Sequence, residues 1–129
     1  MRSRIIVGAL IVVAGLALTA THPAANPAVK WAAVNLVDTV SIAGAFVTGP
    51  VVFVHDDAKM ARGEPCTSVH RYDKDKGIGK TLVAFHCTPR WGKAPSTFTR
   101  GTAHRPEGPP VMTEYQFAGD EEAHLVPIK

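Results

Sequence analysis

An uninterrupted apolar run opens the chain, from Ile5 to Ala20, and it follows two basic residues, Arg2 and Arg4. This order of positive charge, apolar core and small final residues is typical of a secretory signal peptide. A helix over the 16 apolar residues spans about 24 Å, less than the roughly 30 Å of a bilayer's hydrocarbon core. We therefore expect residues 1–20 to be a cleaved export signal. The alternative is an uncleaved membrane anchor over residues 5–20.

Alanine and proline dominate residues 21–33, which predicts a tether between the export signal and a folded domain at 34–129. Within that domain, short runs rich in β-branched and aromatic residues alternate with turns rich in Gly and Pro. Six or seven short strands of this kind predict an all-β fold, a small antiparallel β-sandwich or open barrel. The expected strands are 34–42 (continuing weakly to 47), 51–55, 66–72, 81–87, 96–100, 111–117 and 124–128.

One helical turn is expected after the second strand, where Asp56 can cap residues 57–62 and Gly63 can end them. The segments 88–95 and 101–110 are expected to be loops. The chain is therefore predicted to carry almost no helix beyond its apolar start.

A polar, glycine-containing turn over residues 73–80 predicts a β-hairpin between its two flanking strands. If Tyr72 pairs with Thr81, the antiparallel register places Cys66 opposite Cys87. A cross-strand disulfide can bridge this distance, and disulfides persist in exported proteins. We expect a Cys66–Cys87 disulfide that stabilises the fold by about 3 kcal/mol. The alternative is a thiolate metal site with nearby histidines.

The composition excludes two broad classes of protein, and the net charge limits the kinds of partner that we expect. With 46% apolar residues and two cysteines, the chain is neither a disordered protein nor a disulfide-dense miniprotein. Without residues 1–20 it keeps 12 of 14 Lys and Arg and all 11 Asp and Glu, so the net charge falls from +3 to +1. No nucleic-acid partner is expected for an exported domain of this charge. Membrane contact is expected only through residues 1–20, if they remain.

The histidines carry the best candidate chemistry. His55 ends a predicted strand and is followed by Asp56 and Asp57, while His70 lies in the next strand. Imidazole and carboxylate together suit zinc, copper or iron, and neighbouring strands can gather distant residues on one side of a sheet. His55, Asp56 or Asp57, and His70 therefore form a candidate metal site, although their spacing matches no known metal signature.

Cations and aromatic residues alternate in the middle of the chain, at Arg90, Trp91, Lys93 and Arg100. Surfaces that bind polyanions have this composition. An envelope or extracellular polyanion is therefore a candidate partner, against the alternative of an ordinary solvated face.

A hydrolase needs a nucleophile, a base and an orienting acid. Ser68 with His70 or His86, and Asp56 or Asp57, supplies these residue types, but no G-x-S-x-G elbow accompanies them. The first hypothesis is thus an exported, non-enzymatic binding or envelope-associated module that needs no cofactor. The alternatives are a protein that binds a transition metal and a small hydrolase.

Overall fold

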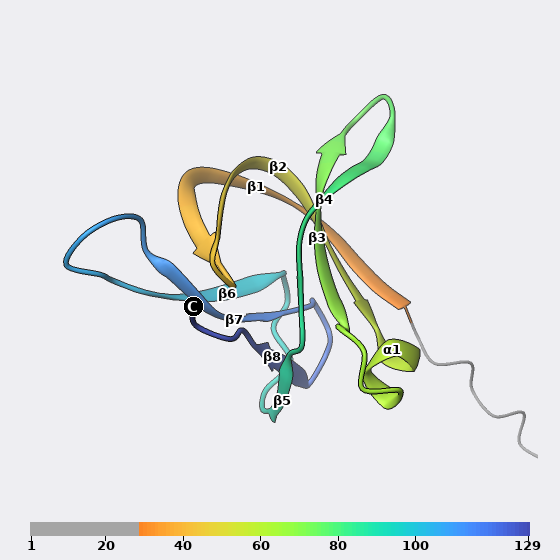
Figure 1. Ribbon diagram of the computed structural model, residues 1–129. Coiled ribbons are helices and arrows are strands. Elements are labelled where there is room, and N and C mark those ends of the chain that lie inside the picture. The colour runs from red at the N-terminus through yellow and green to blue at the C-terminus, as the bar shows by residue number, and fades with distance from the viewer. Residues whose placement is uncertain (1–28) are drawn as a thin grey trace, which may run out of the picture.

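The computed structural model describes residues 29–129, and the predicted export signal and most of the predicted tether lie outside this range. This range holds eight strands and one short helix. The strands form a single sheet in the order β4-β3-β2-β1-β7-β8-β5, with β6 paired to β7 (Figure 1). The elements are β1 (Val29–Ile42), β2 (Ala45–Asp56), α1 (Asp57–Ala61), β3 (Thr67–Asp73), β4 (Gly77–Phe85), β5 (Thr88–Trp91), β6 (Thr99–Ala103), β7 (Val111–Gln116) and β8 (Glu122–Leu125).

The all-β prediction is confirmed, but the strands are arranged differently from a sandwich. They belong to one open sheet, and its halves meet through a short parallel contact between Ser41 of β1 and Val111 of β7. All the other strand pairs in residues 29–129 are antiparallel. The sheet bends so that Phe53 of β2 packs on Tyr115 of β7, with ring centroids 5.2 Å apart. One curved, open sheet therefore encloses the core, which differs from the two sheets of a sandwich and is closer to the open barrel, the other arrangement expected.

The β1–β2 hairpin is longer than the sequence suggested. The chain reverses at Ala43 and Gly44, which have φ values of 47° and 89°. Two positive φ angles are the pattern of a two-residue type I′ turn, and Gly44 adopts this conformation without steric cost. The pattern was expected to continue weakly as one strand across this point. β1 also begins at Val29, so the last five residues of the expected tether, 29–33, belong to a strand.

The helical turn forms where it was predicted. Asp56 caps α1, and its side chain accepts hydrogen bonds from the N–H groups of Ala58 (2.9 Å) and Lys59 (3.2 Å). Gly63 follows with a φ of 71°, so the chain turns away immediately. The helix fixes the position of the residues directly after β2.

The β3–β4 hairpin is confirmed, but the predicted register is wrong. Thr67 pairs with Phe85, and the register shifts twice toward the turn, on either side of His70. Each shift adds a residue to one strand, and a slip of one residue turns every side chain to the other face. Cys66 and Cys87 therefore lie just beyond the paired strands and not opposite each other within them.

The C-terminal half was predicted least well. β7 lies where it was expected, whereas β5 replaces an expected loop, β6 begins three residues late and β8 begins two residues early. All four residues of β5 are exposed, so this edge strand has no alternation to reveal it. Pro89 of β5 pairs with His124 of β8. An edge strand tolerates proline because its outer N–H groups need no partner.

Candidate metal centre

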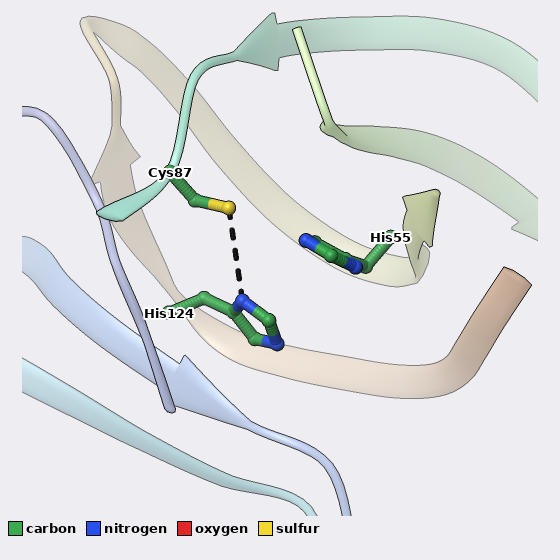
Figure 2. A group of neighbouring side chains, drawn as sticks. All are labelled: His55, Cys87 and His124. Carbon is green, nitrogen blue, oxygen red and sulfur yellow. Dashed lines mark hydrogen bonds between the residues drawn. The ribbon is translucent and has the colours of Figure 1, made fainter. Parts of the chain in front are cut away.

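Three buried side chains from distant parts of the chain converge inside the sheet. His55 comes from the end of β2, Cys87 from the link between β4 and β5, and His124 from β8 (Figure 2). Each offers one donor atom, and these atoms all lie within 4.8 Å of one another. Both histidines are 1% exposed, and Cys87 is 9% exposed.

Strand alternation brings the two histidines to the interior. Val51, Phe53 and His55 are alternate residues of β2 and all three are buried. His124 pairs with Tyr115 of the neighbouring β7, and the two rings stack with centroids 4.9 Å apart. The rings of His55 and His124 then lie only 4.1 Å apart. The same side-chain positions that build the core therefore deliver two imidazoles to one place.

Among residues 29–129, most of the nitrogen atoms in these two rings find no hydrogen-bond partner. Neither Nδ1 nor Nε2 of His55 is bonded, and Nε2 of His124 is also without a partner. A buried polar atom left unpaired costs about 1–3 kcal/mol, so such atoms are rare in folded proteins. Three such atoms in one cluster are a cost that the described fold does not offset with hydrogen bonds.

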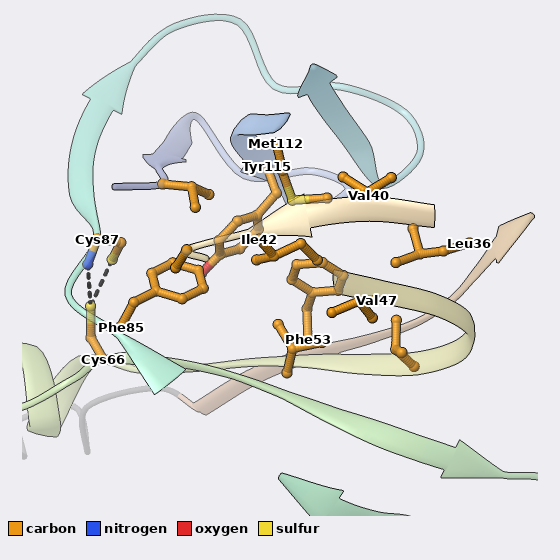
Figure 3. Packing of buried hydrophobic residues seen from close by; sticks show 14 of the residues in the cluster. Leu36, Val40, Ile42, Val47, Phe53, Cys66, Phe85, Cys87, Met112 and Tyr115 are labelled. Carbon is orange, nitrogen blue, oxygen red and sulfur yellow. Dashed lines mark hydrogen bonds between the residues drawn. The ribbon is translucent and has the colours of Figure 1, made fainter. Parts of the chain in front are cut away.

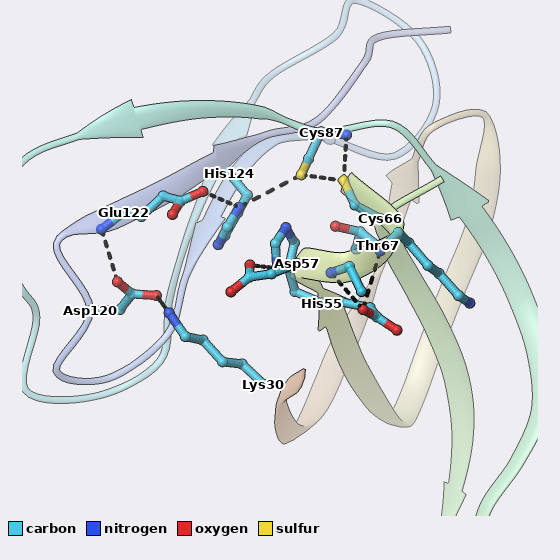
Figure 4. Close-up of polar contacts among 12 residues, drawn as sticks. Lys30, His55, Asp57, Cys66, Thr67, Cys87, Asp120, Glu122 and His124 are labelled. Atoms are coloured by element: carbon cyan, nitrogen blue, oxygen red, sulfur yellow. Dashed lines mark hydrogen bonds and ion pairs between the residues drawn. The ribbon is translucent and has the colours of Figure 1, made fainter. Parts of the chain in front are cut away.

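Carboxylates stand behind both imidazoles (Figure 4). Oδ1 of Asp57 lies 3.2 Å from Nδ1 of His55, and Oε1 of Glu122 lies 3.6 Å from Nδ1 of His124. Histidines that bind metals usually direct their second ring nitrogen to a carboxylate, which orients the ring and makes it more basic. Nδ1 of His124 also lies 3.6 Å from the sulfur of Cys87, so this nitrogen faces both the thiol and the carboxylate of Glu122.

The rim of the cluster carries more negative than positive charge. Nζ of Lys30 donates to Oδ2 of Asp120 at 2.5 Å. Burial alone would raise the pKa of Asp120, but the hydrogen bonds from Lys30 and from the backbone N–H of Glu122, together with the charge of Lys30, lower it overall. Burial and the nearby Asp120 and Asp57 raise the pKa of Glu122. Three carboxylates beside one ammonium group favour a cation in this part of the molecule.

Burial sets the protonation of the three donors. It lowers the pKa of His124 to about 4 and also lowers that of His55, so both rings are neutral at pH 7 and keep a free lone pair. Burial, followed by the contact with Cys66, raises the pKa of Cys87 to about 12. At pH 7 the cluster therefore holds two neutral imidazoles and a protonated thiol.

Cys66 lies next to Cys87 but outside the set of three. The two sulfur atoms are 2.7 Å apart, farther than the roughly 2.05 Å of a disulfide bond, and both cysteines are free. The backbone N–H of Cys87 donates to the sulfur of Cys66 at 3.3 Å. Both sulfurs lie at the margin of the apolar core, beside Phe85 (Figure 3). Their proximity agrees with the sequence, while the disulfide itself stays a prediction.

The metal ligands expected from sequence are only partly brought together. His55 belongs to the cluster, and Asp57 lies beside its ring. Asp56 instead caps α1. His70 is three residues along β3 from Thr67, the partner of His55, which is roughly 10 Å along a strand. The ring of His70 bonds the hydroxyl groups of Ser68 (2.8 Å) and Thr81 (3.1 Å), outside the cluster.

The same contacts bear on the hydrolase alternative. Ser68 and His70 do meet, with Oγ and Nε2 2.8 Å apart. The other ring nitrogen faces the hydroxyl of Thr81, whereas a catalytic triad needs a carboxylate there to stabilise the charged imidazole. In residues 29–129, neither bonded neighbour of this ring is acidic, so the pair lacks its orienting acid.

The predicted polyanion-binding residues are exposed, but one of them is neutralised. Trp91 is 70% exposed at the end of β5. Arg90 forms two hydrogen bonds of 2.9 Å to Glu114, so its charge is paired within the protein. Lys93 follows β5 and Arg100 lies in β6, where it pairs with Tyr115. Polyanion binding stays a prediction, with less free positive charge than the sequence suggested.

Sequence reasoning missed His124, and it expected a disulfide at Cys87 with a thiolate metal site as the alternative. The signal for His124 was weak, because its expected strand began at this residue and hid the alternation before it.

None of the helices in the described range is long and apolar enough to cross a membrane. No family model matches the chain, and comparisons with curated proteins and with solved structures find no significant match.

Proposed function

We propose that this chain is a non-enzymatic binding module for a transition-metal ion, copper or zinc, held by His55, Cys87 and His124. The observation that carries the proposal is the cluster of three buried donor atoms within 4.8 Å of one another. It is supported by the three unpartnered ring nitrogens and by the carboxylates of Asp57 and Glu122 behind the rings.

The donor types select the class of metal. A thiolate and two imidazoles suit copper and zinc, whereas magnesium and calcium prefer oxygen ligands. Zinc lies about 2.0 Å from imidazole nitrogen and about 2.3 Å from sulfur, so donors around it are roughly 3.3–3.8 Å apart. Separations of up to 4.8 Å need only small side-chain movements to reach this spacing.

The number of donors separates the two metals. Two imidazoles and one thiolate in a trigonal arrangement are typical of copper sites. Zinc prefers four ligands, so it would take a water molecule in the remaining position. Titration with both metals therefore tests the assignment as well as the site.

Export and an envelope role remain part of the proposal. An exported binding module agrees with the apolar start of the chain, with a net charge near zero after it, and with a folded part of about 100 residues. Such a chain would hold a metal ion outside the cytosol, with residues 1–20 either removed or anchoring it.

The test is a titration of the full-length reduced chain with Co(II), Zn(II) and Cu(I). Co(II) reports thiolate coordination by a sulfur-to-metal absorption band, and competition with a chromophoric chelator gives the affinities. Cys87→Ser should remove the band, and His124→Ala should weaken Zn(II) binding at least 100-fold. His70→Ala is the matched control and should bind as the wild type does. Binding no tighter than micromolar, or equal losses in all three variants, would contradict the proposal.

A further inference from the structure

The thiol of Cys66 has no role in the proposed coordination, although it is the nearest neighbour of the ligand sulfur. It lies 2.7 Å from the sulfur of Cys87 but outside the group of donors that lie within 4.8 Å of one another. It is 3% exposed, and a backbone N–H holds its sulfur in place at 3.3 Å. A second buried thiol fixed against a metal-binding thiol is the arrangement of a pair that can be oxidised together.

We infer that Cys66 makes the metal site redox-sensitive: the site binds its ion when both cysteines are reduced and releases it when they join. This inference rests on the proposed metal-binding function. The sulfur of Cys87 would serve as a ligand in one state and as half of a disulfide in the other. The disulfide expected from the sequence and the thiolate metal site are then two states of one protein.

Cys87 is the group through which the two states exclude each other. A metal ion needs its sulfur as a thiolate, because only the charged form donates strongly. In a disulfide the same sulfur is neutral and bound to Cys66, so only His55 and His124 remain. Two neutral imidazoles without the thiolate form a weak site for zinc or Cu(I), which depend on the third, anionic donor.

The oxidation is a thiol–disulfide exchange with an external disulfide. One sulfur–sulfur bond forms between Cys66 and Cys87, and the sulfur–sulfur bond of the oxidant breaks. The two electrons lost by the cysteines reduce the oxidant to two thiols, which also receive the two protons. Access to Cys87 comes from β5, a four-residue edge strand with every residue exposed, because short edge elements open at low free-energy cost.

The coupling works in both directions. If oxidation weakens metal binding 100-fold, then a saturating metal ion makes oxidation 100-fold less favourable. For a two-electron couple this factor raises the reduction potential of the pair by about 59 mV. The metal ion would thus protect the thiols that bind it.

The experiment compares Zn(II) affinity in the reduced and oxidised full-length chain. Zn(II) is used because it has no redox chemistry, and the oxidant is oxidised bis(2-mercaptoethyl) sulfone, a cyclic disulfide that leaves no lasting adduct on a single thiol. Thiols are counted by alkylation and intact mass in each sample. The oxidised wild type should have no free thiol and should bind Zn(II) at least 100-fold more weakly than the reduced form.

Cys66→Ser separates this inference from the proposed function. The variant should bind Zn(II) as the reduced wild type does, because Cys66 is not a ligand, and oxidant should not change its affinity. Cys66→Ala and a far-ultraviolet circular dichroism spectrum show whether any loss comes from misfolding. If the reduced wild type binds no Zn(II), the proposed function fails. If it binds equally well before and after oxidation, or keeps two thiols in oxidant, only the redox control fails.

Discussion

Two groups of histidine in this protein differ in how their ring nitrogens are satisfied. On β3, His70 is half-buried, and both of its nitrogens have a hydroxyl partner, from Ser68 and Thr81. In the interior, His55 and His124 are 1% exposed, yet three of their four nitrogens have no hydrogen-bond partner within the part of the chain that the structure describes. Hydrogen bonding normally improves with burial, because an unpaired polar group costs more where water is excluded.

The proposed metal site would account for this reversal. The ring of His70 is accounted for by its two hydrogen bonds, so it needs no ligand to explain it. The interior pair is destabilising as it stands, and in the proposed site a bound cation would supply missing partners. Destabilised clusters of this kind persist at functional sites, where stability is lost in favour of binding. Four experiments test this contrast, in order of decreasing effect.

Metal binding should stabilise the fold through the interior pair alone. Zn(II) at 100 times its dissociation constant should raise the free energy of unfolding by about 2.7 kcal/mol, because only the folded state binds it. For a domain of this size, that corresponds to a rise in melting temperature of about 10 °C or more. Thermal unfolding followed by circular dichroism measures the shift. His70→Ala should keep the shift and His55→Ala should lose it; equal shifts in both would erase the contrast.

Acid should destabilise the metal-free protein through the interior histidines. The pKa of His124 is 6.5 in an unfolded chain and about 4 in the fold. Between these values the unfolded chain binds a proton that the folded chain does not, so stability is complete above pH 6.5 and falls toward pH 4. The expected loss between pH 7 and pH 5 is about 2 kcal/mol. Urea unfolding at pH 7, 5 and 4 measures it.

The control for this pH series is His124→Phe, which cannot take up the proton. Its free energy of unfolding should fall less between pH 7 and pH 4 than that of the wild type, and the difference isolates the histidine from the carboxylates. Parallel pH profiles for the two proteins would show that the ring of His124 is not held neutral by burial.

An apolar ring in place of His124 should stabilise the metal-free protein. His124→Phe keeps the stacking on Tyr115, whose ring lies 4.9 Å away, and removes an unpartnered nitrogen. We expect a gain of about 1 kcal/mol at pH 7 together with the loss of Zn(II) binding. Chemical denaturation and a Zn(II) titration measure the two effects. A variant that loses both stability and binding would show that the imidazole has a structural role.

The smallest effect is expected at His70. His70→Ala removes two hydrogen bonds on a half-exposed surface, so the free energy of unfolding should fall by about 0.5–1 kcal/mol. Zn(II) affinity should stay within about twofold, since the residue lies outside the cluster. A double-mutant cycle with Ser68→Ala measures the pair directly. A large loss of Zn(II) affinity would return His70 to the metal site.

The local sequence was sufficient to predict those elements whose ends depend on capping and turn residues. Asp56 and Gly63 fixed the ends of a helical turn, and the polar segment before Lys80 correctly indicated a hairpin. Alternation also identified β7. The sequence was insufficient to predict strands that form only by pairing with a distant strand. An example is β5, whose exposed residues become a strand only because β8 lies beside them.

The candidate site likewise has one residue that the sequence could predict and others that it could not. His55 was recognisable as a candidate because it ends a strand-like run and precedes two acids. The register of β3 and β4 could not be derived from residue pattern, since the two shifts around His70 depend on backbone geometry. The partners of His55 come from 32 and 69 residues farther along the chain, and no sequence spacing relates them.

The sequence by itself determined an all-β domain, the nearness of Cys66 to Cys87 and the chemical types available for a site. Those properties depend on alternation, turn residues and side-chain chemistry, which act over a few residues. Only the tertiary structure decided that the sheet bends on itself and brings the ring of His124 against the ring of His55. Bending follows from the packing of strands that are distant in sequence, and the same packing excludes water and leaves the ring nitrogens of the cluster without partners.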